Sequence, residues 1–414
     1  MSQSRSGKIN WGEDQMNLNL FSYFKGDKVI WMIVVLLSLL SLTSVYSSIV
    51  ALAFKHHSGD TGFYLFRHGK ILVLGFALMY FTHKIRYTYF SRISQIMVIL
   101  SIPLLLYTLL RGASLNEASR WIAIPLTGLT FQSSDFAKLA LIMYVARIVT
   151  QKQSEMQNFK SVLINIMAPV FIVCGLILPA NFSTAALLLA TCLTLMFIGR
   201  VPFKHIAKVL GLAVVGFSFL LMLGHFFPKT LPRLKVWETR LIEFFKGQED
   251  KDPDKSYQAN QAKIAIATGG LEGKGPGRST QRNFLPQAYS DFIYAIIIEE
   301  YGSIIGGVIP VLLYLILLFR GVRVATKSQK TFGTLLSFGL AFSLIFQGLI
   351  NMAVAVNLFP VTGQPLPFLS MGGTSLLFSS IAIGIILSVS RETESGEDKL
   401  PVAETPKGGT LATT

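Results

Sequence analysis

The sequence predicts an all-α integral membrane protein with about ten transmembrane helices and a large extracytoplasmic loop between helices 7 and 8. Of its 414 residues, 51% are hydrophobic and only 14% are charged, and the mean hydropathy is +0.53. Such a composition is typical of membrane proteins. Apolar runs, most of them near the roughly 20 residues that a helix needs to cross the hydrocarbon core, cover residues 29–54, 69–83, 93–110, 136–150, 162–178, 182–199, 206–227, 303–319, 331–352 and 373–390. Since the second and fourth runs are short and flanked by polar residues, nine spans or a re-entrant pair is the alternative.

The two ends of the chain are polar and predict tails outside the membrane domain. We expect a cytoplasmic tail over residues 1–28, a polytopic membrane domain over 29–391 and a disordered cytoplasmic tail over 392–414, because the end compositions cannot build a core. No small-residue cleavage pattern follows the first apolar run, so it is expected to stay as the first helix. The large external loop is expected over residues 228–288, and loops of such length are usually functional.

Lys and Arg are distributed unevenly between the two sets of loops. They gather at residues 84–92, 147–160, 200–208 and 320–330. The loop over residues 353–372, on the opposite side, has neither. The positive-inside rule therefore predicts that both termini are cytoplasmic. The formal net charge of +15 favours anionic lipid as a partner, and no nucleic-acid motif accompanies it.

The two cysteines, Cys174 and Cys192, lie inside apolar runs without metal-ligand spacing. We interpret them as small packing residues.

The stretch NFLPQAYSDFIYAIIIEEYG places a carboxylate, Asp291, where polar chain gives way to apolar chain. Pro286 is expected to end the loop, and Ser290 or Asp291 to cap the next helix. Glu299 and Glu300 follow in the same apolar run, where carboxylates are usually functional or paired. If one helix continued inward, Glu299 would lie about 12 Å deeper than Asp291.

A partly desolvated carboxylate at the mouth of an apolar cavity, facing a basic glycine-rich loop, has the character of a general base beside an anion clamp. A helix cap and an ion-coupled transport site are the alternatives for Asp291. The loop stretch IATGGLEGKGPGRS does not match a Walker motif, and its glycines allow either a phosphate approach or a flexible turn.

Three further places have polar or irregular chain near the outer side. Asp135 and Lys138 share a helix face and predict either a structural ion pair or a binder of polar headgroups. Arg120, followed by Trp121, is typical of an interfacial anchor and could also grip phosphate. The segment AVAVNLFPVTGQPLPFLSMGGTS contains three prolines and three glycines among apolar residues. It is a candidate re-entrant wall around a site, with an ordinary interfacial loop as the alternative.

These motifs resemble the SEDS family (FtsW, RodA and SpoVE), bacterial membrane glycosyltransferases of peptidoglycan with ten transmembrane helices. The resemblance covers nearly all the chain outside the tails. The family's LPEAHTDFIFAxxxEExG is similar to residues 285–302, its PVTGxPLPFxSxGGxS to 360–375 and its YQxxQxxxAIxxGG to 257–270.

This sequence departs from the family pattern in four places. Asp135 stands where the family has Glu, and Asn181 where it has Asp, so a charge at the second position is in doubt. Gln287 and Tyr289 replace Glu and His beside Asp291, so a His donor is not required here.

The resemblance implies polymerisation of lipid II on the outer face of the bacterial cytoplasmic membrane. Asp291 would be the general base, and cations would stabilise the leaving undecaprenyl pyrophosphate. The substrate-binding residues implied are Arg120, Asp135, Lys138, Arg233, Arg240, Gln258, Gln261, Lys263 and Ser370. The supporting residues implied are Pro286, Glu299, Glu300, Pro360, Gly363, Pro367, Gly372 and Gly373. A divalent cation, Mg²⁺ or Mn²⁺, could assist, although the sequence shows no clear protein cage for it.

The resemblance also implies a partner, a class B penicillin-binding protein, because this chain has no Ser-x-x-Lys motif of a transpeptidase. The variant VTGQPLPFLSMGGTS resembles the FtsW branch, which implies other division proteins as partners and a septal location. A RodA-like role in elongation is the alternative. A lipid II flippase and a non-catalytic scaffold are the rival functions; the first suits intramembrane acids, and the second needs no Asp291.

Overall fold

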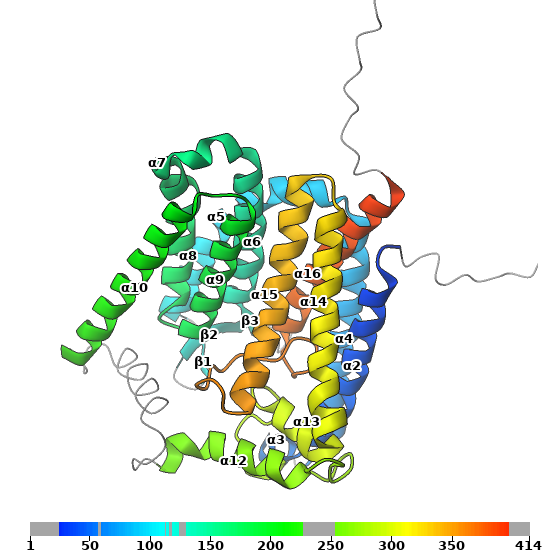
Figure 1. Ribbon diagram of the computed structural model, residues 1–414. Helices are drawn as coiled ribbons and strands as arrows, with labels where there is room; N and C mark the ends of the chain where they lie inside the picture. The colour runs from blue at the N-terminus through cyan, green and yellow to red at the C-terminus, as the bar shows by residue number, and fades with distance from the viewer. Residues whose placement is uncertain are drawn as a thin grey trace, which may run out of the picture.

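The chain folds into a bundle of membrane-length helices, as the sequence predicts (Figure 1). The computed structural model describes residues 25–56, 59–111, 113–115, 118–123, 130–226 and 253–396. The helices of the first half are α2 Lys28–Ser48, α3 Val50–His56, α4 Thr61–Lys84, α5 Tyr87–Arg111, α6 Ser133–Gln151, α7 Phe159–Val162, α8 Ala168–Ile177, α9 Phe182–Ile198 and α10 Phe203–Phe226. Those of the second half are α12 Pro253–Gly269, α13 Ile293–Gly302, α14 Ile309–Lys327, α15 Thr331–Ala355 and α16 Thr374–Ser395.

Within this part of the chain, eight helical stretches are long and apolar enough to cross a membrane. The shorter apolar α9 and the polar-flanked α6 fill the two remaining predicted runs, and both pack against α15 inside the bundle. π-helical segments, Leu163–Met167 and Ser303–Val308, lead into α8 and α14. The first and last described residues lie at the same end of the bundle (Figure 1), which we call the tail end. The opposite end, where α12 lies, we call the loop end.

At the tail end, ion pairs hold the helix termini. Asp27 caps α2 by accepting from the N–H of Val29 at 2.9 Å, and its Oδ2 lies 2.7 Å from Nε of Arg320 on α14. Glu392, a fully buried residue of α16, accepts from the N–H of Tyr87 at 3.0 Å and lies 3.5 Å from Arg391. Since α16 runs to Ser395, the expected boundary at residue 391 falls inside a helix.

A small sheet that the sequence did not predict lies between α5 and α6. Strands β1 Ala113–Leu115, β2 Ala118–Ala123 and β3 Thr130–Gln132 pair antiparallel in that order. The pair Trp121 and Gln132 fixes the register of β2 against β3. Strands of three and six residues with glycine and proline between them carry too little alternation to be recognised in a sequence.

The start of α6 has no side-chain cap. Ser133 and Ser134 already belong to the helix, and Gln132 precedes it without a side-chain cap bond. The N–H of Gln132 instead donates to Oγ1 of Thr374, at the start of α16, at 3.1 Å. Gln132 is the last residue of β3 and directly precedes α6. Its N–H is bonded by a residue of a neighbouring helix rather than by a side-chain cap.

The chain reverses at Gly302, which contradicts the expected helix running inward from Asp291. Gly302 has a φ of 76°, and a Cβ there would lie 2.1 Å from the carbonyl oxygen of Leu271. Beyond it α13 and α14 lie side by side: a Cβ on Gly306 would lie 2.3 Å from the carbonyl oxygen of Ile297, and the Tyr294 hydroxyl donates to Gly307 at 2.8 Å. Glycines at 302, 306 and 307 allow this close hairpin.

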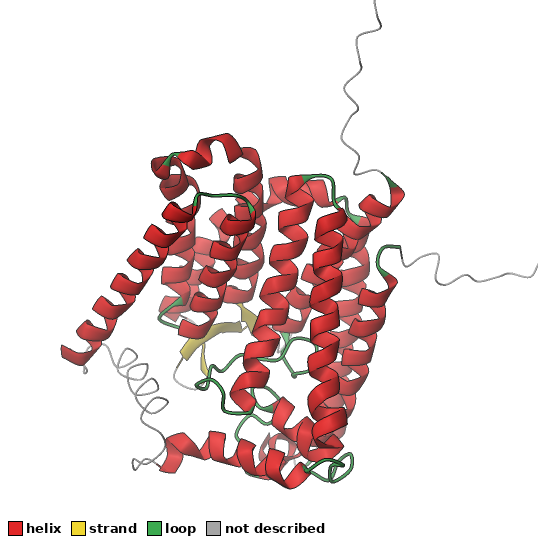
Figure 2. Ribbon diagram, viewed as in Figure 1, coloured by secondary structure: helices red, strands yellow, loops and turns green. Residues whose placement is uncertain are grey.

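The hairpin inverts the expected order of depth. Because α14 runs from the loop end to the tail end, α13 must run the other way (Figure 1). Glu299 and Glu300 therefore lie nearer the loop end, and Asp291 lies farther into the bundle. Toward the loop end Figure 2 shows the sheet and long loops, whereas helices at the tail end are joined by short connections.

Candidate functional site

Asp291 lies at the junction between the loop and α13, with its side chain half-buried. It does not cap the helix, because α13 starts after Phe292 without any side-chain cap bond. The hydroxyl of Ser290 donates to Oδ1 of Asp291 at 3.0 Å. Nδ2 of Asn351, on α15, donates to the Asp291 carbonyl oxygen at 2.9 Å. The backbone is therefore fixed by a helix while the carboxylate stays accessible.

Tyr289 is a phenol beside this carboxylate. Burial raises the pKa of Tyr289, and the negative charge of Asp291 raises it further. The phenol therefore keeps its proton at neutral pH and can donate it in a hydrogen bond. Tyr289 occupies the position where the family pattern has His, so a donor is retained beside Asp291.

The segment between α15 and α16 has no regular helix over residues 356–373, as its prolines and glycines predict. Its carbonyl groups are bonded by side chains from the surrounding helices. The bonds join Asn351 Nδ2 to the oxygen of Gln364 at 2.7 Å, Gln347 Nε2 to Pro365 at 3.0 Å, Tyr314 Oη to Pro367, and Ser41 Oγ to Leu369 at 2.9 Å. Irregular backbone inside a membrane bundle is tolerated when protein groups satisfy it in this way.

Ser370 joins this segment to the chain before Asp291. Its hydroxyl accepts from the N–H of Leu366 at 2.7 Å and donates to the carbonyl oxygen of Ser290 at 2.6 Å. The N–H of Met371 donates to the carbonyl oxygen of Tyr289 at 2.9 Å. With a side chain only 2% exposed, Ser370 lies behind Asp291 and holds its backbone.

Asp135 and Lys138 form the predicted i,i+3 ion pair, with Nζ 2.8 Å from Oδ1. Nζ also donates to Oε1 of Gln347 at 2.9 Å. Lys138 thus supports Gln347, which in turn supports the Pro365 carbonyl group. Oδ2 of Asp135 has no hydrogen-bond partner among the described residues. The pair borders a cavity of about 50 Å³ that is also lined by Ser343, Ser375 and Ser379, enough space for ordered water.

Glu299 and Glu300 hold the glycine-rich loop against the bundle. Oε1 of Glu299 lies 2.6 Å from Nζ of Lys274 and accepts from the N–H of Thr280 at 3.1 Å. Oε1 of Glu300 accepts from the Ser47 hydroxyl on α2 and from the N–H of Ser279 at 3.3 Å. Both side chains are at most 1% exposed. Their bonds explain why two carboxylates tolerate burial here.

The other predicted residues occupy varied positions. Gln258 and Gln261 are half-buried on α12, and Lys263 is exposed. Pro286 is exposed, Pro360 is half-buried, and Gly363 and Gly373 have φ of 64° and 46°. Gly372 and Pro367 lie within the irregular segment. Arg120 lies in β2, where only its backbone is described, and Arg233 and Arg240 lie outside the described residues.

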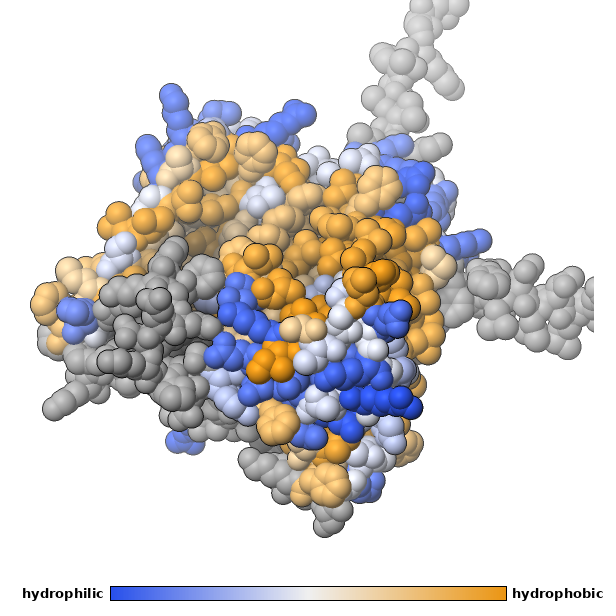
Figure 3. All heavy atoms as spheres, turned by 60° about the horizontal axis from the view of Figure 1, so that its bottom comes forward, coloured by the Kyte–Doolittle hydropathy of each residue, from blue (hydrophilic) through white to orange (hydrophobic). Residues whose placement is uncertain are grey.

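The surface of the loop end is mixed in character. Figure 3 turns this end toward the viewer and shows hydrophilic residues gathered between apolar flanks. In the described part of the chain, no three His, Cys, Asp or Glu side chains come together as a metal site.

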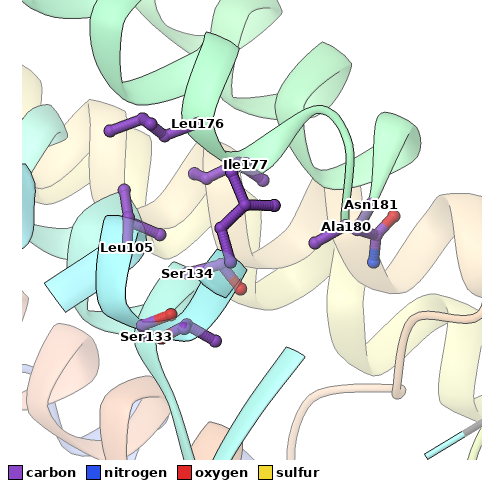
Figure 4. A pocket seen from close by; sticks show the side chains of 9 residues that line it. Leu105, Ser133, Ser134, Leu176, Ile177, Ala180 and Asn181 are labelled. Atoms are coloured by element: carbon purple, nitrogen blue, oxygen red, sulfur yellow. The ribbon is translucent and has the colours of Figure 1, made fainter. Parts of the chain in front are cut away.

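A second small cavity lies between the start of α6 and the turn that joins α8 to α9. Ser133 and Ser134, at the start of α6, face Ile177, Ala180 and Asn181 at the α8–α9 turn (Figure 4). The cavity has a volume of about 20 Å³, room for a single water. Oδ1 of Asn181 accepts from the N–H of Thr184 at 3.2 Å and caps α9. An amide at this position therefore has a structural use that needs no charge.

Comparison with known proteins decides the family. Residues 27–395 match the family model described as the cell cycle protein FtsW/RodA/SpoVE. The chain belongs to this FtsW/RodA/SpoVE family. It is 33% identical over 88% of its length to the probable peptidoglycan glycosyltransferase FtsW of Trichlorobacter lovleyi, covering 93% of that protein. It is 30% identical to the stage V sporulation protein E of Bacillus subtilis, over 88% of this chain and 97% of that one.

Two solved structures share the fold. A chain from a peptidoglycan synthase complex aligns with a TM-score of 0.67 at 24% identity, covering 89% of this chain and 98% of that one. The rod shape determining protein RodA of Thermus thermophilus aligns with a TM-score of 0.60 at 22% identity, over 89% and 97%. The chain is therefore a multi-pass helical membrane protein, which confirms the predicted fold class.

Sequence reasoning missed the residues that support the site. Asn351, Gln347 and Tyr314 bond the irregular segment and the Asp291 backbone, yet none was predicted. Gln347 and Asn351 are polar residues four apart in an apolar run, hence on one helix face. Polar residues within a membrane span usually face a functional interior, and that signal would have found them.

Proposed function

We propose that this protein is a peptidoglycan glycosyltransferase that polymerises lipid II on the outer face of the cytoplasmic membrane. The observation that carries the proposal is the environment of Asp291: a half-buried carboxylate with its backbone fixed by Asn351, beside a neutral phenol, at the end of the bundle rich in loops. The name of the Trichlorobacter lovleyi relative, a probable peptidoglycan glycosyltransferase, supports the reaction class.

In the proposed reaction Asp291 accepts the proton of a sugar hydroxyl of the acceptor. The hydroxyl oxygen then bonds to the anomeric carbon of the donor chain, whose bond to undecaprenyl pyrophosphate breaks. The leaving group keeps the electron pair, and cations stabilise its charge. Arg120, Lys263, Arg233 and Arg240 are the proposed cations, with Gln258 and Gln261 as polar contacts. A Mg²⁺ or Mn²⁺ ion on the pyrophosphate is part of the proposal, and chelation by EDTA tests it.

Of the two roles expected for Lys138 and Asp135, we favour the structural ion pair over the binder of polar headgroups. Nζ of Lys138 already contacts a carboxylate and an amide oxygen, and the side chain is 16% exposed. We propose that this pair acts mainly through Gln347 on the irregular segment. The substrate would meet it only through the adjoining cavity.

The proposed partner is a class B penicillin-binding protein that supplies transpeptidation. Support comes from the fold shared with a chain of a peptidoglycan synthase complex. The FtsW name of several relatives favours a role in division, with other divisome proteins and a septal location, over a role in elongation.

The decisive experiment compares Asp291→Asn with Asp60→Asn in the purified complex with the partner, with transpeptidation blocked. Asp60 is a control acid, an exposed cap of α4 that accepts from the N–H of Phe63 at 3.1 Å. Asp291→Asn should lower glycan synthesis by at least about 100-fold, the low end for loss of a general base, with lipid II binding retained. Asp60→Asn should keep parent activity, because Asn caps a helix as well as Asp does.

A fully active Asp291→Asn protein would contradict the catalytic assignment. Transport of lipid II across vesicle membranes without polymer, abolished by the same change, would instead support a flippase. A chain whose only defect is loss of partner recruitment would be a scaffold.

A labelling experiment tests the proposed orientation, with both tails in the cytoplasm. Leu271→Cys, at a position 70% exposed beside α12, should react with an impermeant thiol reagent in intact spheroplasts. Ser154→Cys, in the exposed turn after α6, should react only after lysis. The reverse pattern would place Asp291 on the cytoplasmic side and exclude lipid II polymerisation there.

A further inference from the structure

A fully buried histidine, His68 on α4, is bonded to a serine that supports the irregular segment. Nε2 of His68 lies 2.9 Å from Oγ of Ser41 on α2, and Ser41 Oγ lies 2.9 Å from the carbonyl oxygen of Leu369. Both His68 and Ser41 have an exposure of 0%. Three segments far apart in the sequence thus meet in one line of hydrogen bonds.

The chemistry of the groups fixes the direction of these bonds. A carbonyl oxygen only accepts, so the single proton of Ser41 goes to Leu369. The oxygen of Ser41 must then accept from His68, which requires the proton of the imidazole on Nε2. Nδ1 of His68 has no hydrogen-bond partner among the described residues and is buried. His68 therefore serves as a one-sided donor aimed at Ser41.

The line continues to the carboxylate. Leu369 precedes Ser370, whose hydroxyl donates to the carbonyl oxygen of Ser290 at 2.6 Å. The hydroxyl of Ser290 donates to Asp291 at 3.0 Å. A shift of Leu369 would move Ser370 and, with it, the residue that contacts the proposed base.

We infer that His68 and Ser41 are positioning residues that hold the Leu369–Ser370 segment, and through it Asp291, in the reactive geometry. The inference rests on the proposed function. The sequence motifs include neither His68 nor Ser41. The positioning role accounts for the buried imidazole.

A comparison with other buried serines shows that the bond of Ser41 leaves its own helix and supplies a control residue. In most membrane helices a serine hydroxyl bonds to its own helix, and here Ser48 donates to Val45, Ser94 to Ser91 and Ser101 to Val98. Ser41 instead donates across the bundle, as Ser47 of the same helix does to Glu300. Ser44, one turn further along α2, is equally buried and its hydroxyl has no partner among the described residues. It is a matched control.

The first test compares Ser41→Ala with Ser44→Ala in the complex with the partner. Ser41→Ala should lower kcat of glycan synthesis by about tenfold or more, since a displacement of about 1 Å can cost up to 100-fold, while KM for lipid II and the melting temperature stay near the parent values. Ser44→Ala should match the parent. Parent-like kcat in Ser41→Ala, or an equal loss in both variants, would overturn the inference.

The second test uses the conservative change at His68. His68→Gln retains an N–H donor for Ser41 and should restore most of the activity that His68→Leu loses. If Leu is as active as the parent, or if Gln is no better than Leu while both variants fold and insert, the imidazole has no positioning role.

The third test does not depend on activity. Hydrogen exchange of the amides of Leu366 and Met371, which donate to Ser370 and Tyr289, should quicken in Ser41→Ala and stay unchanged in Ser44→Ala. Unchanged exchange in both would refute the support of the segment by Ser41. If exchange responds as expected while the parent itself makes no glycan, the structural support stands and the proposed function fails.

Discussion

The tail end and the loop end of the bundle use polar side chains in opposite ways. At the tail end, Asp27 and Glu392 contact arginines and backbone N–H groups where helices begin. At the loop end, side chains such as Asn351 and Ser370 bond to the backbone of irregular segments. The polar side chains of the tail end hold the ends of helices, whereas those of the loop end stabilise non-helical chain inside the bundle.

The difference teaches where function can be placed in a membrane bundle. In irregular backbone the carbonyl and N–H groups do not bond to one another as they do in a helix. Groups outside the segment must therefore form hydrogen bonds with them. That requirement brings Gln347, Asn351 and Tyr314 to one place. These contacts fix the backbone around Asp291 while its side chain stays half-buried. Among the described residues, no carboxylate at the tail end lies beside a segment supported in this way.

The largest effect is expected at the reversal of the chain. Gly302→Ala should lower the free energy of unfolding by about 4 kcal/mol or more, because a side chain at positive φ costs about 1–3 kcal/mol and its Cβ also meets the Leu271 carbonyl group. Gly277→Ala shares the φ of 76° with no atom within 4 Å of its Cβ, and should lose only about 1 kcal/mol. Thermal unfolding in nanodiscs measures both. Equal losses would show that close packing at Gly302 is not needed.

The next effect concerns the ion pair that supports the irregular segment. Lys138→Met should lower the free energy of unfolding by about 3 kcal/mol, because it leaves Asp135 buried and unpaired. The double variant Asp135→Asn/Lys138→Met should recover part of that loss.

A different outcome would support Lys138 as a residue that binds the substrate. In that case Lys138→Met would keep its stability while lipid II binding falls by about tenfold, the equivalent of about 1.4 kcal/mol.

A smaller effect is expected at the tail end. Asp27→Asn keeps the cap of α2 but loses the ion pair with Arg320, and should lower the free energy of unfolding by about 1 kcal/mol, the upper value for a partly exposed pair. Glycan synthesis at saturating lipid II should not change. Loss of synthesis without loss of stability would show that the two ends are coupled.

The smallest effect is expected at the surface pair Lys152 and Glu155. A hydrogen bond from Lys152, joined by one from Ser161, holds the pKa of Glu155 below its usual value. A carboxylate with a lowered pKa stabilises the fold at neutral pH and loses this contribution as pH falls through that pKa. Lys152→Met should therefore shift the melting temperature slightly at pH 7 and not at all in strong acid. A difference that grows in acid would contradict this account.

The sequence predicted the helices well and the site only in part. Apolar runs locate the membrane-spanning helices, because apolar side chains are needed both inside the bundle and against lipid. The spacing of the motif located Asp291. The direction of α13 could not be predicted, because Gly302 reverses the chain inside an apolar run that looks continuous. The contacts of His68, Ser41 and Asn351 were also out of reach, since they join residues far apart in the sequence through tertiary packing alone.

The hairpin at Gly302 has a consequence for biogenesis. The stretch Ile293–Lys327 has 35 residues, about 52 Å as one straight helix, longer than the roughly 30 Å hydrocarbon core. Lys274 and Ser47, which contact Glu299 and Glu300, both precede this stretch in the chain and are therefore synthesised before it. The bend at Gly302 keeps each of the two helices within the thickness of the hydrocarbon core, and α2 is available to hold it when the stretch enters the membrane. A chain expressed without α2 should lose the contact between Glu300 and Ser47, and its hairpin should be less stable.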